Sequence, residues 1–453
     1  MLKLPGLIDP HVHMREPGLT RHIISTIVIL LLLIAACNPG TLQSVTPTGD
    51  SITSLTDNPT PSATLPLPAA ANVRILLGAP ELVFDYSTDT CRRAEGYDLP
   101  DVPARAFRTP DGSIELIFTG PPYNFVQRGA GFASLQHDCQ TPALITTDSP
   151  DAFTFDNQEW ILAVYRDGDL VHALIHNEYH DPRAANCLPG VTTPENHCWY
   201  NTITYAVSTD GGYTFSQPGA PGQLAAALPI PWNPNAIEGR MRLPNPYGYM
   251  SPSNIVQGTD GYFYSLFRSL PDPLGQQGGG TCLMRTAALT DPSSWRAWDE
   301  SGFNLTMFSP YDLNGNPAPT GLSACTYVSP ENTLQMSDSL TFNTYLNQYI
   351  LVGAAVAPVN GALTCGTFFT LSSDLIHWSA PQLLMEHQLP FPPCIEADAL
   401  PNGSIVYPSL IDHADESLNF EFTSQSAYLY YVLWNDGLDR DLWRIPVTFS
   451  FEP

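Results

Sequence analysis

Residues 208–215, Ser-Thr-Asp-Gly-Gly-Tyr-Thr-Phe, have the composition of a tight turn between two short β-strands. The preceding residues, Tyr-Ala-Val at 205–207, are typical of a strand end. The Gly-Gly pair permits the positive φ angles that reverse the chain, and the Asp210 carboxylate can accept hydrogen bonds from amides of the turn. Phe215 is expected to pack back between the strands. The stretch therefore predicts a strand-turn-strand unit.

The same signature recurs along the chain. Asp148, Asp291 and Asp374 each follow a Ser or Thr and precede an aromatic residue by four or five positions, and the four aspartates lie 62, 81 and 83 residues apart. Such spacings would hold a sheet of four short strands with loops, as in one blade of a propeller. Four signatures and a C-terminal remainder predict an all-β chain, a five-bladed β-propeller. The alternative is a set of ordinary hairpin turns.

Two of these stretches resemble known families. Residues 208–215 resemble the Asp-box of sialidases. Residues 373–378, Ser-Asp-Leu-Ile-His-Trp, resemble a sequence motif common in five-bladed glycoside hydrolases of families 43 and 32. The resemblance covers roughly residues 72–453. It implies a propeller that acts on carbohydrate, although Asp-boxes also occur in propellers that catalyse nothing.

Composition narrows the class of partner. Charged residues make up 14% of the chain, aromatic residues 11%, and there are 32 glycines and 44 prolines, which suits short strands joined by turns. The formal net charge is −26, which disfavours nucleic acid as a partner. We expect a monomer that binds a glycan, with no cofactor and no metal site; a structural Ca²⁺ ion is left open.

The N-terminal region carries an export signal. Residues 23–36 are apolar, basic residues precede them, and Ile-Ala-Ala at 34–36 leads into Cys37. This pattern resembles a bacterial lipoprotein signal, so we predict a signal peptide over 14–37, with Cys37 lipidated and holding the protein at the outer side of the cell membrane. An uncleaved anchor is the alternative. We expect residues 38–72, which are rich in Pro, Thr and Ser, to form a disordered tether, and the propeller domain to span 73–453.

A second N-terminal motif points elsewhere. Residues 4–18 resemble the first strand and metal-binding turn of dihydroorotases, with His11 and His13 as the metal ligands. That family also needs a bridging lysine, and Lys3 is the only lysine of the chain. We therefore interpret residues 1–13 as a fused fragment or a misassigned start, and dihydroorotase activity is the least favoured function.

Eight cysteines remain besides Cys37, an even number that predicts up to four disulfides in an exported chain. Eight cysteines permit 105 pairings. Neighbours in sequence are the simplest partners: Cys91–Cys139, Cys187–Cys198, Cys282–Cys325 and Cys365–Cys394.

The first strand of the domain carries a candidate acid. A hairpin is predicted over 98–119, with its turn at residues 110–112, and the innermost strand of a propeller blade begins where ligands enter. Asp101 and Arg105 should therefore lie near the channel mouth. In family 43 an aspartate directly before a proline acts as base or nucleophile, and Asp101 resembles it, displaced by one residue. Arg105 is predicted to bind a substrate hydroxyl or carboxylate.

A second candidate cluster ends the strand predicted over 170–180. Alternation places His176, Glu178 and His180 on one side of that strand. Two imidazoles around a carboxylate can bind sugar hydroxyls, position an acid or hold a metal ion. The alternative is a polar, hydrogen-bonded strand end.

Two classes of function follow. The first is a glycoside hydrolase that uses Asp101 and Glu178, with Glu396 and Asp398 as further catalytic candidates, and Asp412, His176 and His180 as binding residues. The second is a non-catalytic propeller that binds glycan or protein through an aromatic platform of Trp199, Tyr200, Trp232 and Tyr247. A sialidase is a third and weaker option. In all of them a strand over 442–451 should pair with residues 81–86 to close the ring.

Overall fold

The computed structural model describes residues 73–91, 98–147, 149–180, 199–232, 247–271, 278–312, 314–317, 324–396 and 399–451. The dihydroorotase-like stretch, Cys37 and the tether lie outside these residues, as do Asp398 and the Cys187–Cys198 pair. The described chain is almost entirely β-structure, and its α-helices are α1 (Tyr86–Asp89) and α2 (Pro330–Thr333). No helix within the described ranges has the length and apolar character needed to cross a membrane. The all-β prediction is confirmed.

The first sheet follows the predicted hairpin. Its order is β3 (Pro100–Arg108), β4 (Ile114–Thr119), β6 (Val126–Gly129) and β7 (Gln136–Asp138). The turn between β3 and β4 contains Gly112 at φ 86°, the left-handed conformation that favours glycine. Two short strands from the same part of the chain, β5 (Tyr123–Asn124) and β8 (Leu144–Ile145), pair with each other in a separate small sheet.

The next two runs of antiparallel strands join into one sheet. The first run is β9 (Gln158–Asp167), β10 (Leu170–His180), β11 (Trp199–Ser208) and β12 (Leu224–Ala227). The second is β13 (Tyr247–Met250), β14 (Val256–Gln257), β15 (Phe263–Ser269), β16 (Gly280–Thr286), β17 (Arg296–Ala297) and β18 (Leu305–Thr306). A short parallel pairing of β11 with β13 connects them. Gly248 sits at this join, where a Cβ atom would lie 2.1 Å from the carbonyl oxygen of Asn201.

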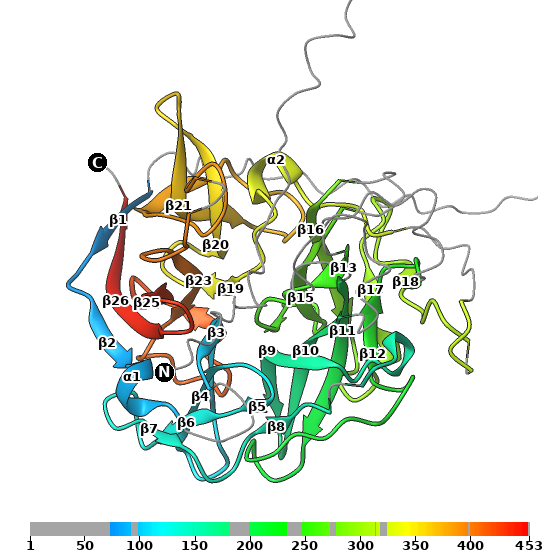
Figure 1. The fold of residues 1–453 in the computed structure, drawn as a ribbon. Helices are drawn as coiled ribbons and strands as arrows, with labels where there is room; N and C mark the ends of the chain where they lie inside the picture. The colour runs from blue at the N-terminus through cyan, green and yellow to red at the C-terminus, as the bar shows by residue number, and fades with distance from the viewer. Residues whose placement is uncertain are drawn as a thin grey trace, which may run out of the picture. The chain divides into compact units, whose positions relative to one another are not determined.

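The C-terminal half forms two further sheets. One contains β19 (Ser339–Asn343), β20 (Gln348–Val359), β21 (Ala362–Ser372), β22 (Gln382–Glu386) and β24 (Phe422–Thr423). The other contains β23 (Ile405–Ile411), β25 (Ser426–Trp434) and β26 (Arg440–Phe451). Here β26 also pairs with β2 (Glu81–Phe84), as predicted, and with β1 (Val73–Leu77), which was not foreseen (Figure 1).

The sheets meet through their innermost strands. Strand β3 packs between β9 and β23, while β19 packs against β23 and β14. Together with the closure of the last strand β26 on the N-terminal β1 and β2, this succession of antiparallel sheets is that of a β-propeller. The number of blades stays a prediction.

The repeated turns have the expected local geometry. The Asp210 carboxylate accepts from the Thr214 amide at 3.0 Å, and the two glycines of the turn have φ of 85° and 107°. Asp291 and Asp374 likewise accept hydrogen bonds from main-chain amides of their turns, and Phe215, Trp295 and Trp378 are buried. Phe215 is thus buried as predicted, and the aromatic residues of two further turns are buried as well, whereas Asp148 lies outside the described residues.

Three of the predicted disulfides are present: Cys91–Cys139, Cys282–Cys325 and Cys365–Cys394. Each links two cysteines that are neighbours in sequence among the described residues. Their presence fits a protein that folds in an oxidising compartment.

Candidate functional site

The starts of the innermost strands lie close together, at the end of these strands where a shared cavity is found. A small cavity of about 20 Å³ at this end is lined by residues at or beside the starts of β3, β9, β19 and β23 and at the end of β13. These include Asp101, Trp160, Ser251, Asp338 and Tyr407. We call this end the channel mouth. Its volume is enough for about one water molecule.

Backbone geometry directs two of these side chains. Ser251 and Tyr407 have φ of 50° and 55°, a conformation that is uncommon for residues other than glycine. Each precedes a Pro-Ser pair, at 252–253 and 408–409, so the same dipeptide follows the unusual backbone conformation in both places. In β23 it coincides with a register shift between Val406 and Ser409. Such strain persists where the surrounding structure holds it, and it clusters at ligand sites.

Asp101 is buried in a set of polar contacts. Its side chain is about 3% exposed and pairs with the Arg440 guanidinium. The Trp160 indole N–H donates to its Oδ2 at 3.1 Å, and the Tyr407 hydroxyl donates to its Oδ1 at 3.2 Å. Burial beside Asp101 and Glu178 raises the pKa of Tyr407 well above its ordinary value, so this tyrosine stays a hydrogen-bond donor. Asp101 is thus held by donors from three strands.

Asp338 has a different environment. Burial raises the pKa of its carboxyl group to about 6, although the Ala354 amide and the charges of Arg105 and Arg268 oppose the shift. The Ala354 amide donates to Oδ2 at 3.3 Å. Asp338 lines the small cavity and also a larger pocket of about 250 Å³. It therefore connects the two spaces and is a carboxyl group that can carry a proton near neutral pH.

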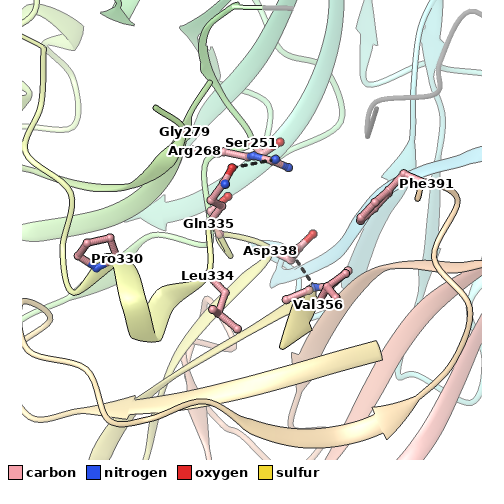
Figure 2. Close-up of a pocket in the computed structure, with 12 residues that line it drawn as sticks. Ser251, Arg268, Gly279, Pro330, Leu334, Gln335, Asp338, Val356 and Phe391 are labelled. Carbon is pink, nitrogen blue, oxygen red and sulfur yellow. Dashed lines mark hydrogen bonds between the residues drawn. The ribbon is translucent and has the colours of Figure 1, made fainter. Parts of the chain in front are cut away.

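The larger pocket combines polar and apolar walls. Arg268 on β15 donates to Gln335 Oε1 at 3.0 Å. Figure 2 shows this pair on one side of Asp338 and the Phe391 ring on the other. Gln335 follows α2 with φ of 65°. The pocket therefore offers hydrogen-bonding groups and an apolar surface at the same place, which is typical of sites for small polar molecules.

The His176, Glu178 and His180 cluster is brought together as alternation along β10 predicts. Glu178 Oε2 lies 3.0 Å from His180 Nε2, and Glu178 Oε1 lies 3.5 Å from His176 Nε2. His176 lines the small cavity and stacks obliquely on Trp160, with ring centroids 5.6 Å apart. Glu178 is not among the described residues that line either cavity. Its role in the reaction stays a prediction.

Arg105 lies at the junction of several sheets. Its Nε donates to the Leu162 carbonyl at 2.6 Å, NH1 donates to Ser409 Oγ at 3.1 Å, and NH2 donates to the Asp338 carbonyl. Burial lowers its pKa to about 9. These contacts join β3 to β9, β19 and β23, and neither cavity has Arg105 in its described lining. The contact of Arg105 with substrate stays a prediction.

The remaining candidates from the sequence are Asp412, Glu396 and Asp398, and neither cavity has Asp412 or Glu396 in its described lining. Asp412 follows the C-terminal end of β23 and accepts from the amides of Ala414 and Ser424, each at 2.9 Å. Because β23 begins at the mouth, Asp412 lies toward the far end of the channel. Glu396 is exposed, close in sequence to the Cys365–Cys394 disulfide, and Asp398 lies outside the described residues.

The proposed aromatic platform is wrong for three of its four residues. Tyr200, Trp232 and Tyr247 are at most 4% exposed and belong to one hydrophobic cluster. Trp232 stacks on Tyr247 with ring centroids 5.8 Å apart. These rings were expected to form a binding surface, but they are packed inside this cluster.

Sequence reasoning overlooked Asp338, Arg268, Tyr407 and Arg440 as site residues. A signal existed for Asp338 and Tyr407, because both stand close to the start of an innermost strand, as Asp101 does. None existed for Arg440, which lies 339 positions from Asp101 in sequence.

No family model matches the chain, and no curated protein matches it. Several solved structures are similar to it. An α-L-arabinanase of Cellvibrio cellulosa, complexed with arabinohexaose, is 12% identical, with 77% of this chain and 91% of that chain covered and a TM-score of 0.41. An α-L-arabinofuranosidase of Lactobacillus brevis is 10% identical, with 76% and 90% covered and a TM-score of 0.42. A GH32 β-fructofuranosidase of Bombyx mori in complex with sucrose is 12% identical, with 80% and 61% covered and a TM-score of 0.40.

Proposed function

We propose that this chain is an exported, lipid-anchored glycoside hydrolase of five blades that acts on a glycan at the channel mouth. One observation carries the proposal: Asp101 on β3 and Asp338, directly before β19, line one cavity, and they differ in their surroundings, because Asp101 pairs with the Arg440 guanidinium whereas burial raises the pKa of Asp338 to about 6. Hydrolysis of a glycosidic bond needs two carboxyl groups of this kind, one charged and one able to donate a proton.

The roles follow from these environments. Asp101, facing the Arg440 guanidinium, acts as the charged carboxylate that attacks the sugar or activates water. Asp338 donates a proton to the leaving oxygen, because its raised pKa keeps part of the population protonated near pH 6. Asp338 is therefore the second catalytic carboxyl group in place of Glu178, and Glu178 orients His176.

The larger pocket receives the sugar beside Asp338. Arg268 and Gln335 present hydrogen-bonding groups for hydroxyls, and the Phe391 ring offers an apolar face of the kind that packs on a sugar ring.

The test is hydrolysis of a panel of aryl glycosides and oligosaccharides by the full chain, with and without a chelator. We expect turnover of at least one sugar, and a loss of at least about 100-fold in kcat for Asp101→Asn. Glu331→Gln, an exposed acid on α2 next to pocket residue Pro330, is the matched control and should leave kcat unchanged. No turnover on any sugar, with glycan binding that Asp101→Asn does not alter, would establish the non-catalytic alternative.

Lipid anchoring is tested separately by mass spectrometry of the native protein. We expect an acylated Cys37 as the N-terminal residue. A mature chain that still contains residues 1–22 would contradict it.

A further inference from the structure

The last strand of the chain supplies a charged partner to the first candidate carboxylate. Arg440 is the first residue of β26, its side chain is fully buried, and its NH1 pairs with Asp101 Oδ1. The guanidinium also lies 4.1 Å from the centroid of the Trp434 ring, at the end of the neighbouring strand β25. Two independent contacts therefore fix this side chain between its own sheet and β3.

A buried ion pair of this kind contributes little net stability, because the free-energy cost of removing both charges from water offsets much of their attraction. Burial lowers the pKa of Arg440 to about 9, which reflects the free-energy cost of removing the guanidinium from water. Apolar residues of similar volume often serve stability equally well at such positions. The pair therefore calls for a role other than stability.

The partners of Asp101 suggest that role. The Trp160 indole and the Tyr407 hydroxyl are neutral donors, one to each oxygen, while Arg440 brings a full positive charge to Oδ1. The neutral donors restrict rotation of the carboxylate, and the guanidinium adds both charge and direction. Removing Arg440 would leave a buried carboxylate that turns or moves toward other donors.

We propose that Arg440 is a positioning residue that fixes the orientation of Asp101 for reaction, so that the strand closing the propeller also completes the active site. The expected effect on kcat rests on the proposed function, whereas the effect on the orientation of the Asp101 carboxylate does not. It explains why β26 begins at the channel mouth and then pairs with β25, β1 and β2 along its length.

The first experiment compares Arg440→Lys and Arg440→Gln with Arg444→Gln. Arg444 is the matched control, because it lies on the same strand and pairs with Glu81, whose side chain is 46% exposed. We expect Arg440→Gln to lower kcat at least about tenfold with little change in KM, Arg440→Lys to retain part of the activity, and Arg444→Gln to keep it. In the Asp101→Asn background, adding Arg440→Gln should cause no further loss of the residual activity. Equal effects of Arg440→Gln in both backgrounds would overturn the proposal.

A second readout needs no turnover. The indole N–H of Trp160 donates to Asp101, so its proton resonance, assigned with Trp160→Phe, reports the position of the carboxylate. We expect this resonance to move in Arg440→Gln and to stay in place in Arg444→Gln. An unmoved resonance in Arg440→Gln overturns the inference even if the protein is an active glycosidase. A moved resonance in a protein that hydrolyses no sugar contradicts only the proposed function. If Arg440→Gln fails to fold, Arg440→Lys provides the same measurement.

Discussion

The two ends of the channel both contain buried carboxyl groups, and they differ in what surrounds them. At the mouth, Asp101 and Asp338 line a cavity. At the far end, Asp412 and Glu421 belong to the segment 412–425, which we call the far-end loop. Asp412 accepts from two amides of this loop, and Glu421 accepts from the Gln257 amide at 2.9 Å and the Tyr165 hydroxyl at 3.3 Å.

The far-end loop is held by the ends of the strands whose starts build the mouth. The amide of Arg108 donates to the Leu418 carbonyl, that of Arg166 to the Asn419 side chain, and that of Phe342 to the Glu421 carbonyl. One loop thus connects β3, β9 and β19. Burial of a carboxyl group is therefore not by itself a sign of function. The acids of the far end accept hydrogen bonds from backbone amides, whereas Asp101 and Asp338 line the small cavity at the mouth and Asp338 also lines the pocket of about 250 Å³.

The largest expected effect lies at the mouth. Asp338→Asn removes the proposed proton donor and should lower kcat by about 10²- to 10⁴-fold, while the free energy of unfolding near pH 7 stays equal or rises, since the variant no longer buries a charge. Steady-state kinetics and urea denaturation measure both quantities. A kcat within about threefold of the unmodified protein would remove Asp338 from the mechanism.

The reverse pattern is expected at the far end. Asp412→Asn leaves one acceptor oxygen where two amides now donate, so it should lower the free energy of unfolding by about 1–3 kcal/mol. Activity per folded molecule should not change, because Asp412 lies away from the mouth. Urea denaturation together with kcat for the folded fraction provides the check. A large drop in kcat with unaltered stability would place Asp412 in the site instead.

A smaller effect is expected in the dependence of stability on pH. The pKa of Asp338 is raised in the folded state from 3.8 to about 6, so the folded state binds the proton more tightly. Its contribution to stability is complete below about pH 4 and is lost as pH rises through 6, with a slope of at most about 1.4 kcal/mol per pH unit. Unfolding free energies of the unmodified protein and Asp338→Asn should therefore diverge between pH 4 and 7. Parallel curves would show that burial does not penalise this charge.

Activity should follow the same group. If Asp338 donates the proton, kcat falls about tenfold per pH unit above its pKa in the complex with substrate, and this alkaline decline is absent from the residual activity of Asp338→Asn. A decline that persists unchanged in the variant would assign it to another group.

Much of the fold could be predicted because its signals are local. The Asp-Gly-Gly turn, the hairpin around Gly112 and the alternation along β10 depend on residues close in sequence. The disulfides between sequence neighbours and the pairing of β26 with β2 were also foreseen. The buried tyrosines were not, because a ring after a loop has the same sequence signature whether it faces water or a neighbouring sheet.

The sequence by itself determined which residues begin the innermost strands, and therefore placed Asp101 at the channel mouth and His176, Glu178 and His180 on one face of β10. Only the tertiary structure decided the partners of those residues. Arg440 meets Asp101, and Asp338 shares its cavity, because the ring of sheets brings strands hundreds of residues apart to one centre. The charge state of a carboxyl group depends on burial and on such partners, and neither quantity is encoded locally.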